Sequence, residues 1–321
     1  MRSPSPLWTR CLLGLAATAL ASSLLACEGS STEVLHSTVA SASGAGGASA
    51  GSSSASEGAG AGSSSGTGGA TGLPCKRGMA YGYNSVADLK ALSPGIGWWY
   101  NWALHPDDSL GAAYTGLGIE FVPMVWGKKS LPDLAKDVPS TARYMLGFNE
   151  PNFGQQANMT PEEAAAAWPE VEKFAKLHDL EIVSPAVNYC GGSCNVTDPF
   201  DWLDQFFAAC PSCKIDAVAM HWYACTKDAL NFYVDKFKSK YAQPLWLTEF
   251  SCLDASDTSV AVQEAYMKEA LAILEAEPRV ARYAWFTGRS DNTPSLDLLG
   301  ADGQLTPLGQ QYVSYPQSCK K

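Results

Sequence analysis

Short apolar segments of strand-forming residues recur eight times along this chain, with helical segments between them. A strand followed by a helix, repeated many times, predicts parallel strand pairing, and eight such units are the number that closes a β/α barrel. The pattern therefore predicts an α/β fold, a (β/α)8 TIM barrel, within residues 74–321. The predicted strands are residues 77–83, 97–102, 121–126, 144–148, 181–187, 217–223, 244–250 and 281–286.

Helix signals lie between several of these segments. Thr160-Pro161 is followed by two glutamates, which is the order of a cap residue, a proline at the first helical position and acids in the first turn. This order predicts a helix that runs to about residue 178. Residues 200–209 and 256–277 are also predicted to be helical.

The first 26 residues are typical of an export signal, because two arginines precede an apolar stretch of residues 11–25. Leu24-Leu25-Ala26-Cys27 resembles a bacterial lipobox, in which cleavage leaves a lipid-bearing Cys27 at the new N-terminus. The alternative is a plain signal peptide with an incidental cysteine. With Glu28 next to the lipidated residue, the chain is expected to be an exported lipoprotein at the outer membrane or cell surface, or to be released from it.

Residues 27–73 follow the signal and consist mostly of serine, glycine and alanine. Such a stretch lacks the apolar side chains needed to form a core, so a disordered linker is expected. The expected organisation is a signal peptide at residues 1–26, the linker at residues 27–73 and one folded domain at residues 74–321. We expect contact with the membrane only through the lipid anchor.

The formal net charge is −10. A negative surface repels nucleic acid, so we expect no nucleic-acid partner. Neutral polysaccharides are not affected by this charge and remain possible substrates. We expect a monomer.

Eight cysteines fall within the predicted domain, and an even number in an exported chain suggests disulfides. Two pairs also have spacings that could hold zinc, although an oxidising compartment favours disulfides. One expected pair joins the two ends of the domain, and another joins the ends of the sixth and seventh strands. The expected pairs are Cys75–Cys319, Cys225–Cys252, Cys210–Cys213 and Cys190–Cys194, of which the last two are the possible zinc ligands.

Two of the predicted strands end in a glutamate: Glu150 follows residues 144–148, and Glu249 lies near the end of residues 244–250. Pro151 stops the first of these strands and turns the chain outward. Strand ends of a β/α barrel form its active face, and two carboxylates that face one groove can cleave a glycosidic bond. The alternative for each glutamate is an exposed loop acid in a salt bridge.

Other polar and aromatic residues are expected at the same rim. Trp102, Trp126 and Trp285 are predicted to stack on sugar rings, whereas Trp98, Trp202, Trp222 and Trp246 are predicted to be core residues. No cluster of His, Asp and Cys indicates a catalytic metal, and no cofactor is expected. His221 could instead be an ordinary buried histidine. The remaining predicted substrate-binding residues are Asn84, Asn101, Asn149, His221 and Tyr223.

Asn149-Glu150-Pro151 on the fourth strand, with Glu249 on the seventh, resembles clan A of the glycoside hydrolases. Within that clan the chain is similar to glycoside hydrolase family 128, which contains β-1,3-glucanases and the fungal alkali-sensitive-linkage proteins. The segments that carry this resemblance are residues 97–102, 146–152, 184–186, 216–223 and 246–250.

The resemblance implies a retaining endo-β-1,3-glucanase with Glu150 as acid/base and Glu249 as nucleophile. It also suggests that Asn149 bonds the 2-hydroxyl of the sugar. Two alternatives remain: a clan A enzyme for another β-glucan, and a carbohydrate-binding surface lipoprotein without turnover.

Overall fold

Parallel β-strands form the centre of the structure, a computed structural model that describes residues 75–136 and 138–317. Every paired strand is parallel to its neighbour, and each of the eight predicted segments overlaps one strand. The predicted α/β fold is therefore confirmed. The strands are β1 (Arg77–Ala80), β2 (Trp98–Tyr100), β3 (Glu120–Phe121), β4 (Tyr144–Leu146), β5 (Glu181–Val183), β6 (Val218–Ala224), β7 (Leu245–Asp254) and β8 (Val280–Trp285).

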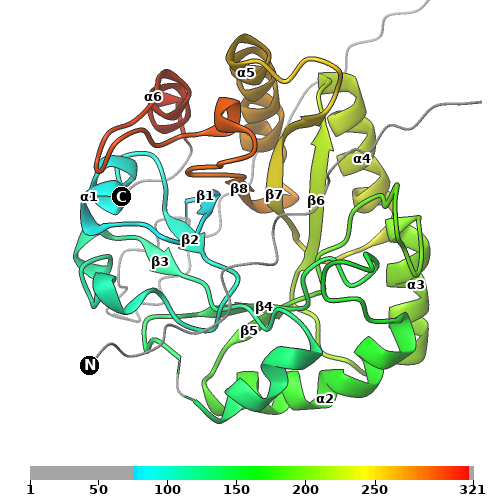
Figure 1. Cartoon of the computed structure of the whole chain (residues 1–321). Helices are drawn as coiled ribbons and strands as arrows, with labels where there is room; N and C mark the ends of the chain where they lie inside the picture. The colour runs from blue at the N-terminus through cyan, green and yellow to red at the C-terminus, as the bar shows by residue number, and fades with distance from the viewer. Residues whose placement is uncertain (1–74, 137, 318–321) are drawn as a thin grey trace, which may run out of the picture. The chain divides into compact units, whose positions relative to one another are not determined.

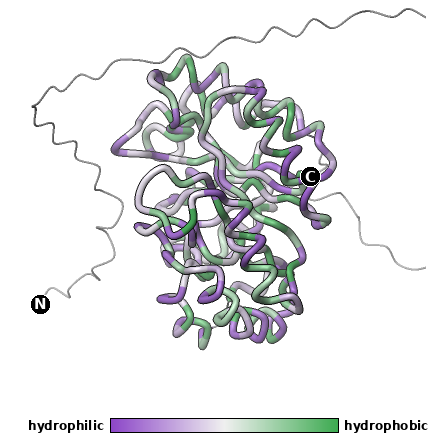
Figure 2. The backbone as a smooth tube through the Cα atoms, turned by 90° about the vertical axis from the view of Figure 1, so that its right-hand side faces the viewer, coloured by the Kyte–Doolittle hydropathy of each residue, from purple (hydrophilic) through white to green (hydrophobic). Residues whose placement is uncertain are grey.

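Six α-helices in the described part of the chain lie around the outside of these strands (Figure 1). Hydrophilic and hydrophobic residues alternate along the outer helices (Figure 2), as expected when one face of a helix packs on a core. The α-helices are α1 (Val86–Leu92), α2 (Pro161–Leu177), α3 (Pro199–Ala209), α4 (Lys227–Lys240), α5 (Val260–Ala276) and α6 (Pro307–Ser314); the 3-10 helices are η1 (Asp108–Leu110), η2 (Thr115–Leu117), η3 (Lys128–Ala135) and η4 (Pro294–Leu296).

Helix α2 begins where its capping signal predicts. The Thr160 side chain accepts a hydrogen bond from the Glu163 backbone, and the Glu163 side chain accepts one from the Thr160 backbone. Helix α5 begins at Val260, four residues later than predicted, because Asp257 accepts a hydrogen bond from the Ser259 backbone and holds a turn there. No helix in the described part of the chain is long and apolar enough to span a membrane.

The strands belong to a six-stranded sheet of order β3-β2-β1-β8-β7-β6 and a two-stranded sheet of β4 and β5. Isolated parallel bridges connect the two sheets. Met124, just after β3, is bridged to Leu146 of β4, and Val183 of β5 is bridged to Ala217, just before β6. Each strand therefore lies beside its neighbours in the chain, and the carboxyl ends of all eight strands face the same side.

Buried side chains form two clusters. The smaller one comes only from the strands and their ends, and includes Trp98, Tyr100 and Trp246. The larger one lies between the strands and the helices, and includes Trp202 and Trp222. All four tryptophans predicted to be core residues are buried, as predicted.

Three disulfides occur among the described residues: Cys190–Cys194, Cys210–Cys213 and Cys225–Cys252. Because the four sulfurs of the possible zinc ligands are bonded in pairs, they offer no thiolate to a metal. Cys75 is disulfide-bonded, and its predicted partner Cys319 lies outside the described residues. The predicted signal peptide, the linker at residues 27–73 and Cys27 also lie outside them.

Candidate active site

Glu150 lies in the loop that follows β4. Its backbone has φ of 40°, in the left-handed region that non-glycine residues rarely adopt, and its N–H donates a hydrogen bond to the Ala186 carbonyl at 2.9 Å. Just after β4, the backbone at Gly147 passes close to the Trp168 ring, since a Cβ atom at this position would lie 2.8 Å from that ring. The chain thus bends at the rim, and the Glu150 side chain is almost fully buried.

Glu249 is turned toward the same place by an irregularity in β7. Leu247 pairs with Met220 and belongs to the helix-facing cluster, yet the next pair in the ladder is His221 with Glu249. Thr248 is therefore an extra residue in β7, as in a β-bulge, which changes the direction of the next side chain. If Thr248 occupied a regular position in the ladder, Glu249 would share the helix-facing side with Leu247, because side chains alternate along a strand.

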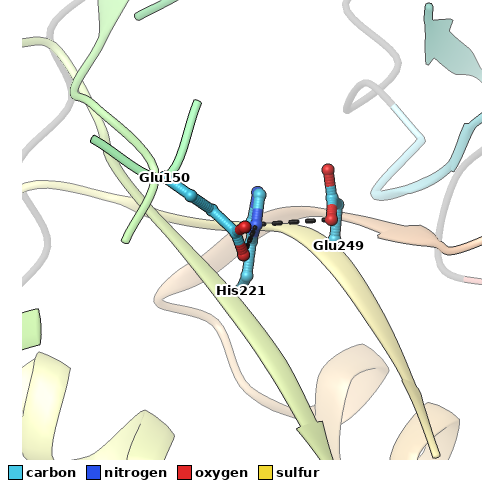
Figure 3. A group of neighbouring side chains, drawn as sticks. All are labelled: Glu150, His221 and Glu249. Carbon is cyan, nitrogen blue, oxygen red and sulfur yellow. Dashed lines mark hydrogen bonds and ion pairs between the residues drawn. The ribbon is translucent and has the colours of Figure 1, made fainter. Parts of the chain in front are cut away.

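His221 joins the two carboxylates (Figure 3). Its Nδ1 atom lies 3.0 Å from Glu150 Oε1 and 3.3 Å from Glu249 Oε2. The ring is fully buried, and its Nε2 atom has no hydrogen-bond partner. His221, predicted as a site residue, thus lies between the two glutamates.

The Glu249 carboxylate accepts three further hydrogen bonds. Trp102 Nε1 donates to Oε1 at 2.8 Å, and the Tyr100 hydroxyl donates to the same oxygen at 3.0 Å. The Tyr223 hydroxyl donates to Oε2. Tyr100 was not among the predicted site residues. Its position two residues before Trp102 is the signal that could have found it, since alternate residues of a strand share a face.

Burial raises the pKa of the Glu249 carboxyl, and the nearby Glu150 charge acts in the same direction, against the hydrogen bonds from Tyr223 and Trp102. Burial alone would lower the pKa of His221, but the two glutamates outweigh it and the pKa is raised. Burial, together with the charge of Glu249, raises the pKa of Tyr100 and Tyr223 well above the ordinary value. Both hydroxyls therefore stay protonated and remain donors.

Glu150, His221 and Glu249 offer ligand atoms that all lie within 4.8 Å of one another, so these three residues are the candidate metal ligands in the described part of the chain. Three protein ligands and a water can form a catalytic metal site. Here the Glu249 oxygens already accept hydrogen bonds from one indole and two hydroxyls. This donor set favours a carboxylate held without a metal.

The three predicted asparagines differ in what they offer to a ligand. The side-chain oxygens of Asn149 and Asn84 are buried without a hydrogen-bond partner. Asn101, in contrast, uses both polar atoms to fold its own loop, since Nδ2 donates to the His105 carbonyl and Oδ1 accepts from the Ala103 backbone. Asn149 directly precedes Glu150, and its Nδ2 atom donates to Gln156 Oε1 at 3.3 Å.

Of the three tryptophans predicted to stack on sugars, Trp102 and Trp126 are partly exposed. Trp285 is not: its side chain is fully buried, its indole N–H donates to the Leu296 carbonyl and its ring packs on Phe250. The prediction for Trp285 is wrong, because alternation along β8 directs this residue toward the helices. The next residue, Phe286, reaches the rim and packs against Trp102 and Tyr223.

Comparison with known proteins gives consistent matches. The family profile described as "Glycosyl hydrolase catalytic core" matches residues 78–312. The crystal structure of an endo-β-1,3-glucanase of glycoside hydrolase family 128, subgroup II, from Sorangium cellulosum is 50% identical, with a TM-score of 0.72, over 76% of this chain and 99% of that one. A subgroup I endo-β-1,3-glucanase from Amycolatopsis mediterranei, in complex with laminaritriose, is 29% identical with a TM-score of 0.62, over 75% of this chain and 99% of that one.

A curated protein also matches, namely alkali-sensitive linkage protein 1 of Schizosaccharomyces pombe. It is 30% identical over 250 residues, which are 74% of this chain. The match spans only 44% of the yeast protein's own length.

Proposed function

Because this chain belongs to the glycosyl hydrolase catalytic core family and, within it, to glycoside hydrolase family 128, we propose that it is an endo-β-1,3-glucanase. The observation that carries this proposal is the meeting of Glu150 and Glu249 at one buried imidazole, on a rim that also bears partly exposed aromatic rings. The 50% identity to a solved endo-β-1,3-glucanase supports the choice of substrate.

The chemistry proposed is hydrolysis with retention of configuration. Glu249 attacks the anomeric carbon while Glu150 donates a proton to the departing glycosidic oxygen. Water then attacks the glycosyl-enzyme, with Glu150 now taking the proton. The ligand oxygens of the two carboxylates lie within 4.8 Å of each other. This short separation supports retention, because an inverting pair leaves room for a water between carboxyls about 6.5–9.5 Å apart.

Neighbouring side chains have roles in both steps. The three donors on Glu249 favour its ionised form, which the attack requires. We assign Asn149 to accept a hydrogen bond from the 2-hydroxyl of the sugar, and the absence of a partner for its buried Oδ1 supports this role. A protein that only binds sugar does not need two buried carboxylates on one histidine, and this argues against the alternative of a binding lipoprotein without turnover.

We also propose that the strands close into a (β/α)8 barrel. The order of the six-stranded sheet, together with the bridges Met124–Leu146 and Val183–Ala217, supports a continuous ring. A closed ring brings the ends of β4 and β7 to opposite sides of one opening, where Glu150 and Glu249 can flank a sugar.

The test of the function is a panel of linear and branched glucans with product analysis. We expect cleavage of laminarin and curdlan within the chain, which releases a series of oligosaccharides whose first products keep the β-anomeric configuration. Glu150→Gln and Glu249→Gln proteins serve as controls for contaminating activity. Cleavage of cellulose or mannan without any cleavage of laminarin, curdlan or pachyman would contradict the proposed substrate.

For cellular location, we propose an exported lipoprotein that is anchored through Cys27 and tethered by residues 27–73. The lipobox-like Leu24-Leu25-Ala26-Cys27 supports this proposal. The test is fractionation of cells that express the full chain or its Cys27→Ser variant. We expect the variant to leave the membrane fraction; equal retention of both proteins would refute the anchor.

A further inference from the structure

Strands β6 and β7 extend beyond the residues that carry the carboxylate and the imidazole. β7 has ten residues and continues five beyond Glu249, and β6 continues three beyond His221. The two strands are still paired at Ala224 and Asp254. This extension carries Tyr223, whose hydroxyl donates to Glu249.

The pairing between β6 and β7 is irregular around Tyr223 and does not by itself fix the position of this residue. The register shifts between Met220 and His221, and again between Trp222 and Ala224. Tyr223 therefore lies at an irregular part of the ladder, where regular pairing is interrupted. Its ring touches Phe286 edge-on and is partly exposed. Something other than the ladder must fix the position of its hydroxyl.

Two features fasten the strands next to Tyr223. The Cys225–Cys252 disulfide joins β7 to the residue that follows β6, with Cα atoms 4.6 Å apart. The fully buried side chain of Gln263, from α5, holds the same point of β7: its amide oxygen accepts from the Cys252 N–H at 3.1 Å, and its amide nitrogen donates to the Cys252 carbonyl.

We propose that the Cys225–Cys252 disulfide and Gln263 form a positioning clamp that fixes the Tyr223 hydroxyl against the Glu249 carboxylate. The clamp touches no substrate and acts only through Tyr223. This inference rests on the proposed role of Glu249 as nucleophile. It assigns to the disulfide a function in the reaction in addition to its contribution to stability.

The test compares Cys225→Ser/Cys252→Ser with the wild type, alone and together with Tyr223→Phe. We expect the clamp variant to lose roughly tenfold in kcat on laminarin, the loss that corresponds to one weak charge-assisted hydrogen bond. KM should change less than about twofold, and the acid limb of the pH profile should move to higher pH. In the Tyr223→Phe background, the same two substitutions should change kcat by less than about twofold.

The matched control is Cys210→Ser/Cys213→Ser, which opens a disulfide before β6, away from the site. This variant should keep the wild-type kcat and pH profile. An equal loss of kcat with and without the Tyr223 hydroxyl, or a loss with an unmoved acid limb, would overturn the clamp and leave a structural disulfide. If the serine variant does not fold, Gln263→Ala and wild-type protein treated with a reductant replace it in the same comparison.

A second readout separates this inference from the proposed function. NMR titration of ¹³C-labelled glutamate measures the ionisation of Glu249 without any substrate. The pKa of Glu249 should rise in the clamp variant and not in the control. If the wild type cleaves no glucan, the proposed function fails, and the titration still decides whether the clamp exists.

Discussion

Replacing Trp102 by phenylalanine removes one hydrogen bond from Glu249 and keeps an aromatic ring at the rim. The two roles available to Trp102 predict different results. If the residue serves mainly to stack on sugar, the phenyl ring retains most of the contact. If it serves mainly through the indole N–H, 2.8 Å from Glu249 Oε1, the variant loses a bond to the nucleophile.

The expected size of the loss follows from the surroundings. A hydrogen bond to a charged group contributes about 1.5–3 kcal/mol. Trp102 is partly exposed, and Glu249 keeps its bonds from Tyr100 and Tyr223, so the lower end of this range applies. Since 1.36 kcal/mol corresponds to a factor of ten in rate, kcat/KM on laminarin should fall roughly tenfold. The acid limb of the pH profile should also move upward, because the lost bond favours the ionised carboxylate.

The assay is steady-state hydrolysis of laminarin from pH 4 to 9, with circular dichroism to verify folding. Trp126→Phe is the matched control: this tryptophan is also partly exposed at the rim, and no hydrogen bond joins its described side chain to a carboxylate. It should lose less than about threefold, with an unmoved acid limb. Equal small losses in both variants, or a Trp102→Phe profile like that of the wild type, would refute the hydrogen-bonding role.

Four further predictions concern the site and its support. Glu150→Gln should keep turnover of an aryl glycoside with an activated leaving group, because such a group leaves without a proton, whereas Glu249→Gln should not; equal losses on this substrate would contradict the two roles. Because burial raises the pKa of Glu249 above its ordinary 4.5, activity should be lost as the pH falls through that raised value; an acid limb in kcat/KM at or below pH 4.5 would contradict this. Trp285→Phe should lower the free energy of unfolding by about 1–3 kcal/mol, measured by denaturant titration, and leave kcat unchanged, since it removes a buried hydrogen bond on the helix-facing side of β8; a changed kcat would restore a site role. Treatment with EDTA should not change the rate, and a loss that a divalent cation restores would indicate a metal between Glu150, His221 and Glu249.

The strands of this protein and the place of its two carboxylates along the chain are determined by local sequence. The helix start at Thr160 and the eight apolar segments can be predicted from a few neighbouring residues, because capping and alternation act over that distance. Glu150 could be located in the same way, since it lies between a short apolar strand and Pro151. The burial of Trp98 and Trp246 followed from their places within apolar segments.

The direction of key side chains was decided only by the tertiary structure. Simple alternation places Glu249 on the same side of β7 as Leu247, toward the helices. The extra residue Thr248, set by pairing with β6, turns it into the site. Trp285 keeps the regular alternation of β8 and faces the helices, where its indole N–H donates to the Leu296 carbonyl. Strand register and side-chain partners depend on segments far apart in the chain, so a local pattern cannot specify them.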